Sequence, residues 1–163
     1  MKALADLDSI YRQNADTVFR FLLARTGSAD LSEELTQETF YQAVKSIDRY
    51  DGSCRISTWL CGIAKNVHLT YLKKRKDTLP MDDALGVSPD SPEETVIRNS
   101  EVREVLRAIK KLPDPGGEIL RLRIMGGLSF RQIGDALGHT ETWARVNYYR
   151  AKQTIAGEVR KNE

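Results

Sequence analysis

Polar and cationic side chains recur along one segment near the C-terminal end of the chain. Glu141, Thr142, Arg145, Tyr149 and Lys152 fall on one side of a predicted helix, away from its apolar residues. Guanidinium, ammonium and hydroxyl groups in such a row form hydrogen bonds to base edges, and the cations attract phosphate. The pattern therefore indicates a surface that binds DNA in the major groove.

Metal or redox chemistry is a weaker interpretation of the cysteines and histidines. Cys61 and His68 are seven residues apart on one predicted helix, which is about 10.5 Å along its axis. A zinc ligand atom must lie within about 2.0 to 2.3 Å of the ion. The sequence also contains no CxxC pair, phosphate-binding loop, GxSxG, HExxH or dinucleotide-binding glycine pattern. We therefore expect no metal, no cofactor, no catalytic residue and no enzymatic activity.

Local signals predict the elements that position the cationic side chains. Ser129 and Gln132 form a capping box, so a helix should begin directly after Ser129. Gly138 suits the positive φ at the end of that helix, and Thr140 can cap the next one. The second helix has an apolar side made of Ala144, Tyr148, Ala151 and Ile155. Residues 125–150 thus resemble a helix-turn-helix, although two ordinary core helices with a solvated basic face would have the same pattern.

Charge divides the chain into three parts. Residues 1–76 have a net charge of +3, residues 77–94 of −6 and residues 95–163 of +5. The acidic part also contains three of the five prolines, a composition that buries little apolar surface. We predict an all-α fold of two small helical domains, 1–76 and 95–163, joined by a flexible acidic linker, 77–94, so that the domains need not touch. The C-terminal domain contains the helix-turn-helix.

The N-terminal domain is predicted to contain three helices. The first spans about residues 8–25, the second begins near Asp30, and the third follows a loop at 48–57 and ends near residue 76. Acidic residues early in the second helix favour either a dipole-matched solvated face or a partner-binding face. Trp59 lies on the apolar side of the third helix and is interpreted as a core residue.

Three sequence features favour a cytoplasmic protein. No run approaches the roughly 18 to 20 apolar residues of a membrane span, and the N-terminus carries two Asp residues where a signal peptide would be apolar. The two cysteines form no disulfide framework, which is typical of a reducing compartment. The sequence assigns no role to Cys54 or Cys61.

Two blocks of the sequence together resemble the sigma-70 family. The first, residues 34–76, is similar to regions 2.2 to 2.4, and the second, residues 112–152, is similar to region 4. The most specific motifs are LTQETF at 35–40, STWL at 57–60, IAKN at 63–66 and GLSFRQIGDALG at 127–138. Short chains that contain only these two regions resemble extracytoplasmic-function (group 4) sigma factors.

The resemblance implies a function, partners and a role for each domain. Such a protein binds core RNA polymerase, directs it to promoters through the minus-10 and minus-35 elements, and promotes DNA melting. The first domain is then the region 2 domain for core polymerase and minus-10 binding, and the last is the region 4 domain for minus-35 binding. The implied partners are core polymerase, through its beta-prime clamp helices and beta flap, promoter DNA and an anti-sigma factor. No small-molecule substrate is implied.

The resemblance also assigns site residues by position. Minus-35 binding is implied for Arg131, Gln132, Thr142, Arg145, Asn147 and Arg150. Minus-10 binding is implied for Tyr50, Asp51, Arg55, Lys65, Asn66 and Lys73. Core polymerase binding is implied for Leu35, Gln37, Glu38 and Tyr41. The chain departs from the family pattern at Thr142, Trp143, Ala144 and Asn147, which leaves the minus-35 sequence undefined.

Two other functions remain open from the sequence. A conventional helix-turn-helix regulator would bind palindromic duplex as a dimer, but residues 1–76 resemble neither a dimerisation domain nor a ligand domain. An adaptor that holds another protein would leave the basic faces solvated. Transcription assays with core polymerase distinguish these functions from that of a sigma factor.

Overall fold

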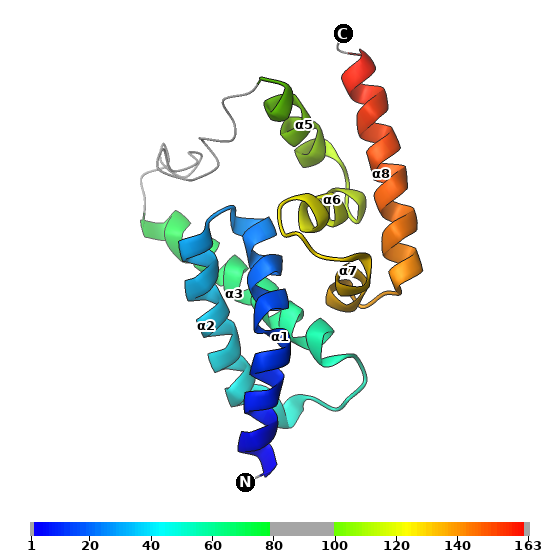
Figure 1. The fold of residues 1–163 in the computed structure, drawn as a ribbon. Coiled ribbons are helices and arrows are strands. Elements are labelled where there is room, and N and C mark those ends of the chain that lie inside the picture. The colour runs from blue at the N-terminus through cyan, green and yellow to red at the C-terminus, as the bar shows by residue number, and fades with distance from the viewer. Residues whose placement is uncertain (1, 79–99, 162–163) are drawn as a thin grey trace.

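The computed structural model describes residues 2–78 and 100–161, which form helices and connecting loops and no strand (Figure 1). The N-terminal half consists of α1 (Lys2–Thr26), α2 (Ala29–Ser46), the 3-10 helix η1 (Ile47–Arg49) and α3 (Ile56–Thr78). The C-terminal half consists of α5 (Ser100–Lys111), α6 (Gly116–Ile124), α7 (Phe130–Leu137) and α8 (Glu141–Lys161). The predicted all-α class is confirmed.

The N-terminal half is a bundle in which α1, α2 and α3 contact one another. Phe21 and Leu22 of α1 and Leu60 and Ala64 of α3 are almost completely buried. Trp59 packs partly buried against this core. The periodicity of the third helix thus predicted its buried side correctly, and Trp59 is a core residue as expected.

The structure confirms one predicted helix start and corrects another. Helix α2 begins at Ala29, within one residue of the predicted start near Asp30, and its N-cap is Ser28, whose hydroxyl accepts a hydrogen bond from the Leu31 amide. Ser is as effective as Asp at this position, so the choice depends on the preceding turn at Gly27. Helix α1 begins at Lys2 and not near Asp8, because Ala, Leu and Lys in its first turns have high helix propensity.

The local predictions for the C-terminal half are confirmed in detail. Both hydrogen bonds of the capping box join Ser129 and Gln132 at the start of α7. Gly138 ends this helix with a φ of 76°, a left-handed conformation that favours glycine. The Thr140 hydroxyl then accepts from the Trp143 amide at 3.1 Å and caps α8. Ala144 and Ala151 lie on the buried side of α8.

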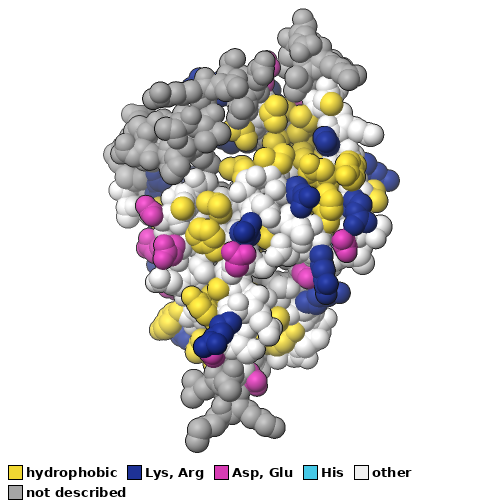
Figure 2. Space-filling view, viewed as in Figure 1, with side chains coloured by type: hydrophobic (Ala, Val, Ile, Leu, Met, Phe, Trp, Pro, Cys, Tyr) yellow, Lys and Arg dark blue, Asp and Glu magenta, His cyan; other side chains and the backbone are white. Residues whose placement is uncertain are grey.

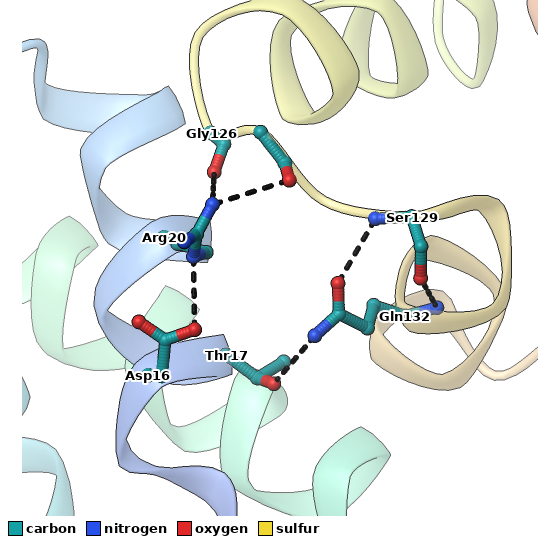
Figure 3. A network of polar contacts seen from close by, with 7 residues as sticks. Asp16, Thr17, Arg20, Gly126, Ser129 and Gln132 are labelled. Atoms are coloured by element: carbon teal, nitrogen blue, oxygen red, sulfur yellow. Dashed lines mark hydrogen bonds and ion pairs between the residues drawn. The ribbon is translucent and has the colours of Figure 1, made fainter.

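The two halves are packed against each other, whereas the sequence predicted that they need not touch. Helix α1 contacts α6, and α3 contacts α7, so a single apolar core includes Leu60 from one half and Leu122 and Ile133 from the other. Figure 3 shows two polar contacts across this boundary: Arg20 donates to the carbonyl oxygens of Gly126 and Gly127, and Gln132 donates to Thr17. The prediction considered only the reach of the linker and carried no information on this interface.

The predicted linker falls almost entirely outside the described residues. Its first two residues, Asp77 and Thr78, continue α3, and residues 79–94 are not described. Among the helices of the described ranges, none has the length and apolarity needed to cross a membrane.

Candidate nucleic-acid and polymerase interface

The exposed side of α8 carries three of the side chains predicted to contact DNA. Thr142, Arg145 and Arg150 are exposed, and Arg145 retains 47% of its side-chain accessibility. Its guanidinium pairs with Glu141 at 3.0 Å and lies 5.7 Å from the centre of the Phe130 ring. These two contacts hold Arg145 near the first turn of the helix. Figure 2 shows Lys and Arg side chains along the edge of the molecule where α8 lies.

Asn147 is placed differently from the other predicted DNA contacts on α8. It is half-buried, and its side-chain amide donates to the Trp143 carbonyl oxygen at 2.8 Å. A bidentate contact with adenine needs both the amide nitrogen and the amide oxygen. Part of that capacity is already committed to the helix backbone in this conformation.

The two predicted DNA contacts on α7 also differ. Arg131 is exposed and lies at the start of the helix. Gln132 accepts from the Ser129 amide at 2.9 Å and approaches Thr17 of α1 at 3.5 Å (Figure 3). Gln132 therefore stabilises the helix start and the contact between the halves.

An aromatic stack at the turn before α8 was not predicted from the sequence. The His139 ring lies parallel to the Trp143 ring, with 3.7 Å between centroids and an angle of 11°. Such a stack restricts both rings and fixes the bulky Trp143 at the beginning of the helix. His139 and Trp143 are four positions apart, a spacing that brings side chains together within a helix. His139 lies in the turn before α8, so this spacing did not predict their contact.

Hydrogen bonds within the 50–55 loop determine its shape. Asp51 accepts from the Ser53 amide at 2.9 Å, and hydrogen bonds from the Ser53 side chain and backbone lower the pKa of Asp51. The Tyr50 hydroxyl donates to the Cys54 carbonyl oxygen, and the Tyr50 ring packs 5.2 Å from the Trp59 ring. Asp51 and Tyr50 thus stabilise the conformation of the loop.

The remaining predicted minus-10 residues lie on or just before α3. Lys65, Asn66 and Lys73 are exposed, and Lys65 and Lys73 are eight positions apart, or about 12 Å along the helix. Arg55, at the end of the loop, forms an ion pair with Asp135 of α7. Asp135 was not predicted as a partner of Arg55, because the two residues are 80 positions apart.

A groove of about 830 Å³ between α2 and α3 brings the predicted polymerase contacts together. Gln37, Glu38 and Tyr41 line its α2 side. Asn66, which was predicted to bind the minus-10 element, lines its α3 side together with Lys74. Tyr41 is 58% exposed, and the Lys45 ammonium lies over its ring, 5.1 Å from the ring centre. Leu35 also lines the groove but is only 5% exposed, so in this conformation its side chain belongs mainly to the core.

A largely buried polar cluster joins α1, α3 and α6. Arg25 donates to Nδ1 of His68 at 3.2 Å and pairs with Glu118 at 3.4 Å. Burial, together with the positive charge of Arg25, lowers the pKa of His68. Burial, together with the negative charge of Glu118, raises the pKa of Cys61 to about 12, which makes its thiol unreactive. The described residues contain no group of three or more potential metal ligands.

Comparison with known proteins gives one consistent family. Residues 10–78 match the family model of sigma-70 region 2. SigM, an ECF RNA polymerase sigma factor of Bacillus subtilis, is 30% identical over 151 residues, which cover 91% of this chain and 92% of SigM. SigW of the same organism is 25% identical and covers 97% of this chain and 89% of SigW.

A further relative is BldN, an ECF RNA polymerase sigma factor of Streptomyces coelicolor. It is 31% identical over 90% of this chain, and the aligned part is 58% of the length of BldN. A solved structure of the RsbN-BldN complex aligns with 92% of this chain and 88% of the other, with 24% identity and a TM-score of 0.37.

Proposed function

The chain belongs to the ECF RNA polymerase sigma factors, which direct promoter-specific initiation of transcription, and we propose how its two halves divide that task. The C-terminal half recognises the minus-35 element, the N-terminal half binds the minus-10 element, and α2 binds core polymerase. The observation that carries the proposal is the similarity to SigM over 92% of that protein's length. The protein acts in the cytoplasm, where polymerase and promoter DNA meet.

Recognition of the minus-35 element is assigned to α7 and α8 as a helix-turn-helix. In this motif the second helix enters the major groove, and its N-terminal residues contact base edges. Arg145 lies in this part of α8, and an arginine reads guanine through two hydrogen bonds. Thr142 and Arg150 flank it on the exposed side, and Arg131 contacts the DNA backbone. Gln132 and Asn147 contribute less, because their amides are already hydrogen-bonded.

Binding of the minus-10 element is assigned to the 50–55 loop and the exposed side of α3. A base that leaves the stack needs a pocket with polar groups, and a single strand needs cationic side chains along its path. Tyr50 and Asp51 are hydrogen-bonded within the loop, but their hydroxyl and carboxylate oxygens can accept further hydrogen bonds. Arg55, Lys65 and Lys73 supply the cations. Asn66 adds a neutral hydrogen-bonding group next to Lys65. Melting then uses binding energy and needs no catalytic residue.

Core polymerase binding is assigned to the groove between α2 and α3. Glu38 and Gln37 offer acidic and polar groups beside the exposed Tyr41 ring, a combination suited to a basic and partly apolar partner surface. The beta-prime clamp helices are the proposed partner here, and the beta flap is the proposed partner of the C-terminal half. A regulatory protein, an anti-sigma factor, is a further proposed partner, because BldN, which is 31% identical to this chain, forms a complex with a second protein, RsbN.

Transcription in a purified system tests this proposal. Core polymerase is incubated with a library of promoter fragments, with and without the chain, and the transcripts are sequenced. The proposal predicts transcripts from a defined subset of fragments only when the chain is present. Binding of palindromic duplex by the chain alone, with no promoter-specific transcript, would instead support a conventional regulator.

A further inference from the structure

The contact between α3 and α7 involves a residue assigned to DNA. The Arg55 guanidinium pairs with the Asp135 carboxylate, and the Thr58 hydroxyl donates to the Asp135 backbone oxygen. Thr58 also packs against the turn at Gly138, where its methyl group lies 3.3 Å from the position that a Cβ would take. The start of α3 is thus attached to the end of α7 by side chain and backbone together.

This contact is one part of a larger interface between the halves. At the other end, Arg25 pairs with Glu118 across α1 and α6. Between them the backbone of α1 approaches Gly126 so closely that a Cβ at Gly126 would lie 2.7 Å from the Arg20 carbonyl oxygen and 3.4 Å from the Ala24 side chain. Close approach through small residues and a continuous apolar core indicate a specific interface.

This closed arrangement is incompatible with simultaneous binding of both promoter elements. The minus-10 and minus-35 elements are roughly 25 base pairs apart by position, which is about 85 Å at 3.4 Å per base pair. In the closed chain, the loop assigned to minus-10 touches the helix that precedes the minus-35 recognition helix. The halves must therefore separate before the chain binds a complete promoter.

We propose that Asp135 is an intramolecular competitor of DNA, which holds Arg55 in a closed state until the halves separate; this rests on the proposed role of Arg55 in minus-10 binding. The carboxylate of Asp135 and a phosphate oxygen accept the same hydrogen bonds from a guanidinium, so they compete for Arg55. The groove between α2 and α3 that is assigned to polymerase stays open in this state. Polymerase binding to this groove therefore does not require opening, whereas minus-10 binding through Arg55 does.

The strength of the Arg55–Asp135 pair itself is modest. Arg55 is 66% and Asp135 21% exposed, and exposed ion pairs contribute little to stability. The apolar interface holds the halves together, while Asp135 determines whether Arg55 is available. The apparent affinity for a single strand is then reduced by the fraction of chains in which Arg55 is free.

Single-strand binding by the purified full chain tests this competition. The ligand is fluorescein-labelled single-stranded DNA of random sequence and about 12 nucleotides, within the range that such grooves cover, and binding is measured by anisotropy. Asp135→Asn keeps the shape of the side chain and removes its charge. We expect about fivefold tighter binding, because a larger fraction of chains has Arg55 free. Unchanged affinity would overturn the proposal.

Two further variants separate competition from a general effect of charge. Glu158→Gln makes the same charge change on an exposed residue of α8, and we expect it to alter affinity by less than about twofold, since one distant charge is largely screened. In an Arg55→Ala background, Asp135→Asn should not change the affinity for single-stranded DNA, because Asp135 then has no guanidinium to pair with. Tighter binding that persists without Arg55, or that Glu158→Gln reproduces in full, would overturn the proposal.

Promoter-specific transcription shows whether a failure concerns this competition or the proposed function. Arg55→Ala should weaken minus-10 selection by the holoenzyme, whatever the outcome for Asp135. If Arg55→Ala leaves minus-10 selection intact, the assignment of Arg55 to DNA is wrong, and the competition fails with it. If minus-10 selection is lost but Asp135→Asn has no effect on single-strand binding, only the competition is wrong.

Discussion

The side chains assigned to DNA differ in their exposure and in the hydrogen bonds that they already form within the chain. Arg145 is exposed and held in place by Glu141 and Phe130, whereas the Asn147 amide is committed to the Trp143 carbonyl oxygen. Positioning without burial suits a side chain that reads a base, because little conformational freedom remains to be lost on binding. The Asn147 amide is less suited to this role, because it is already hydrogen-bonded to the helix backbone.

The first prediction compares these two residues. Arg145→Ala should weaken binding to a minus-35 duplex by about 1 to 3 kcal/mol and relax base preference at one position. Asn147→Ala should cost under about 1 kcal/mol, since its amide is already paired. Fluorescence anisotropy with duplexes that vary at each position measures both effects. Arg107→Ala, on the exposed side of α5, serves as a control for charge, and equal losses for Arg145 and Asn147 would contradict the assignment.

The second prediction concerns the two thiols. Cys54 is exposed, and burial raises the pKa of Cys61 to about 12, so Cys61 has almost no thiolate at neutral pH. A thiol reagent should label one cysteine per folded chain quickly and the second only after urea is added. In Cys54→Ser, rapid labelling of the folded chain should disappear. Rapid labelling of this variant would show that Cys61 is accessible.

The third prediction follows from His68, which is buried beside Arg25, whose guanidinium also pairs with Glu118. Its pKa is lowered from 6.5 in the folded chain, so the folded state binds fewer protons than the unfolded state. The stability that neutral His68 contributes is present above pH 6.5 and is lost as the pH falls through the folded-state pKa.

Urea unfolding between about pH 8 and pH 5 measures this effect. The wild-type chain should lose more stability on acidification than His68→Gln, which keeps a hydrogen-bond acceptor for Arg25 but does not titrate. Parallel stability curves for the two proteins would mean that His68 is not the group responsible.

At the level of helices, the start of α7 provides the fourth prediction. Ser129 and Gln132 satisfy two backbone amides that the helix itself leaves unpaired. Ser129→Ala should therefore lower the free energy of unfolding by about 1 kcal/mol. Gln153→Ala, on the exposed side of α8, should change it by less than about 0.5 kcal/mol. Equal effects in urea unfolding would show that the capping box contributes nothing to stability.

Local chemistry explains which elements were predictable. The capping box, the left-handed Gly138 and the apolar side of α8 are each determined within a few residues, so the sequence predicted α7, the turn and α8 correctly. Helix α2 begins at Ala29, one residue before its predicted start, because Ser28 and Asp30 are both good N-caps and only the preceding turn distinguishes them. Element boundaries depend on such near-equal alternatives.

The candidate site was only partly predictable for a different reason. Exposed side chains such as Arg145 and Lys73 could be assigned from helical spacing and family resemblance. Two ion pairs could not be predicted in this way, Arg55 with Asp135 and Arg25 with Glu118. Their members are 80 and 93 positions apart, and no periodicity relates them. Long-range polar contacts depend on tertiary packing, which the local pattern does not contain.

Considered as a whole molecule, the chain is more compact than its composition suggested. Contacts from α1 to α6 and from α3 to α7 unite the two halves in one core. The proposed function nevertheless places the two halves on promoter elements that are far apart. The interface must therefore be stable enough to form and weak enough for polymerase and DNA to open it. The polar contacts across it include two ion pairs and the hydrogen bond from Arg20 to Gly127.

Promoter selection by the assembled holoenzyme tests the division of labour between the halves most directly. Core polymerase with the wild-type chain, with Arg145→Ala or with Lys73→Ala transcribes a library in which both promoter elements are randomised, and the enriched sequences are compared. We predict two enriched blocks for the wild-type chain, loss of preference in the upstream block only for Arg145→Ala, and weaker enrichment of the downstream block only for Lys73→Ala. Absence of any enriched block, or loss of both blocks together in either variant, would contradict the account.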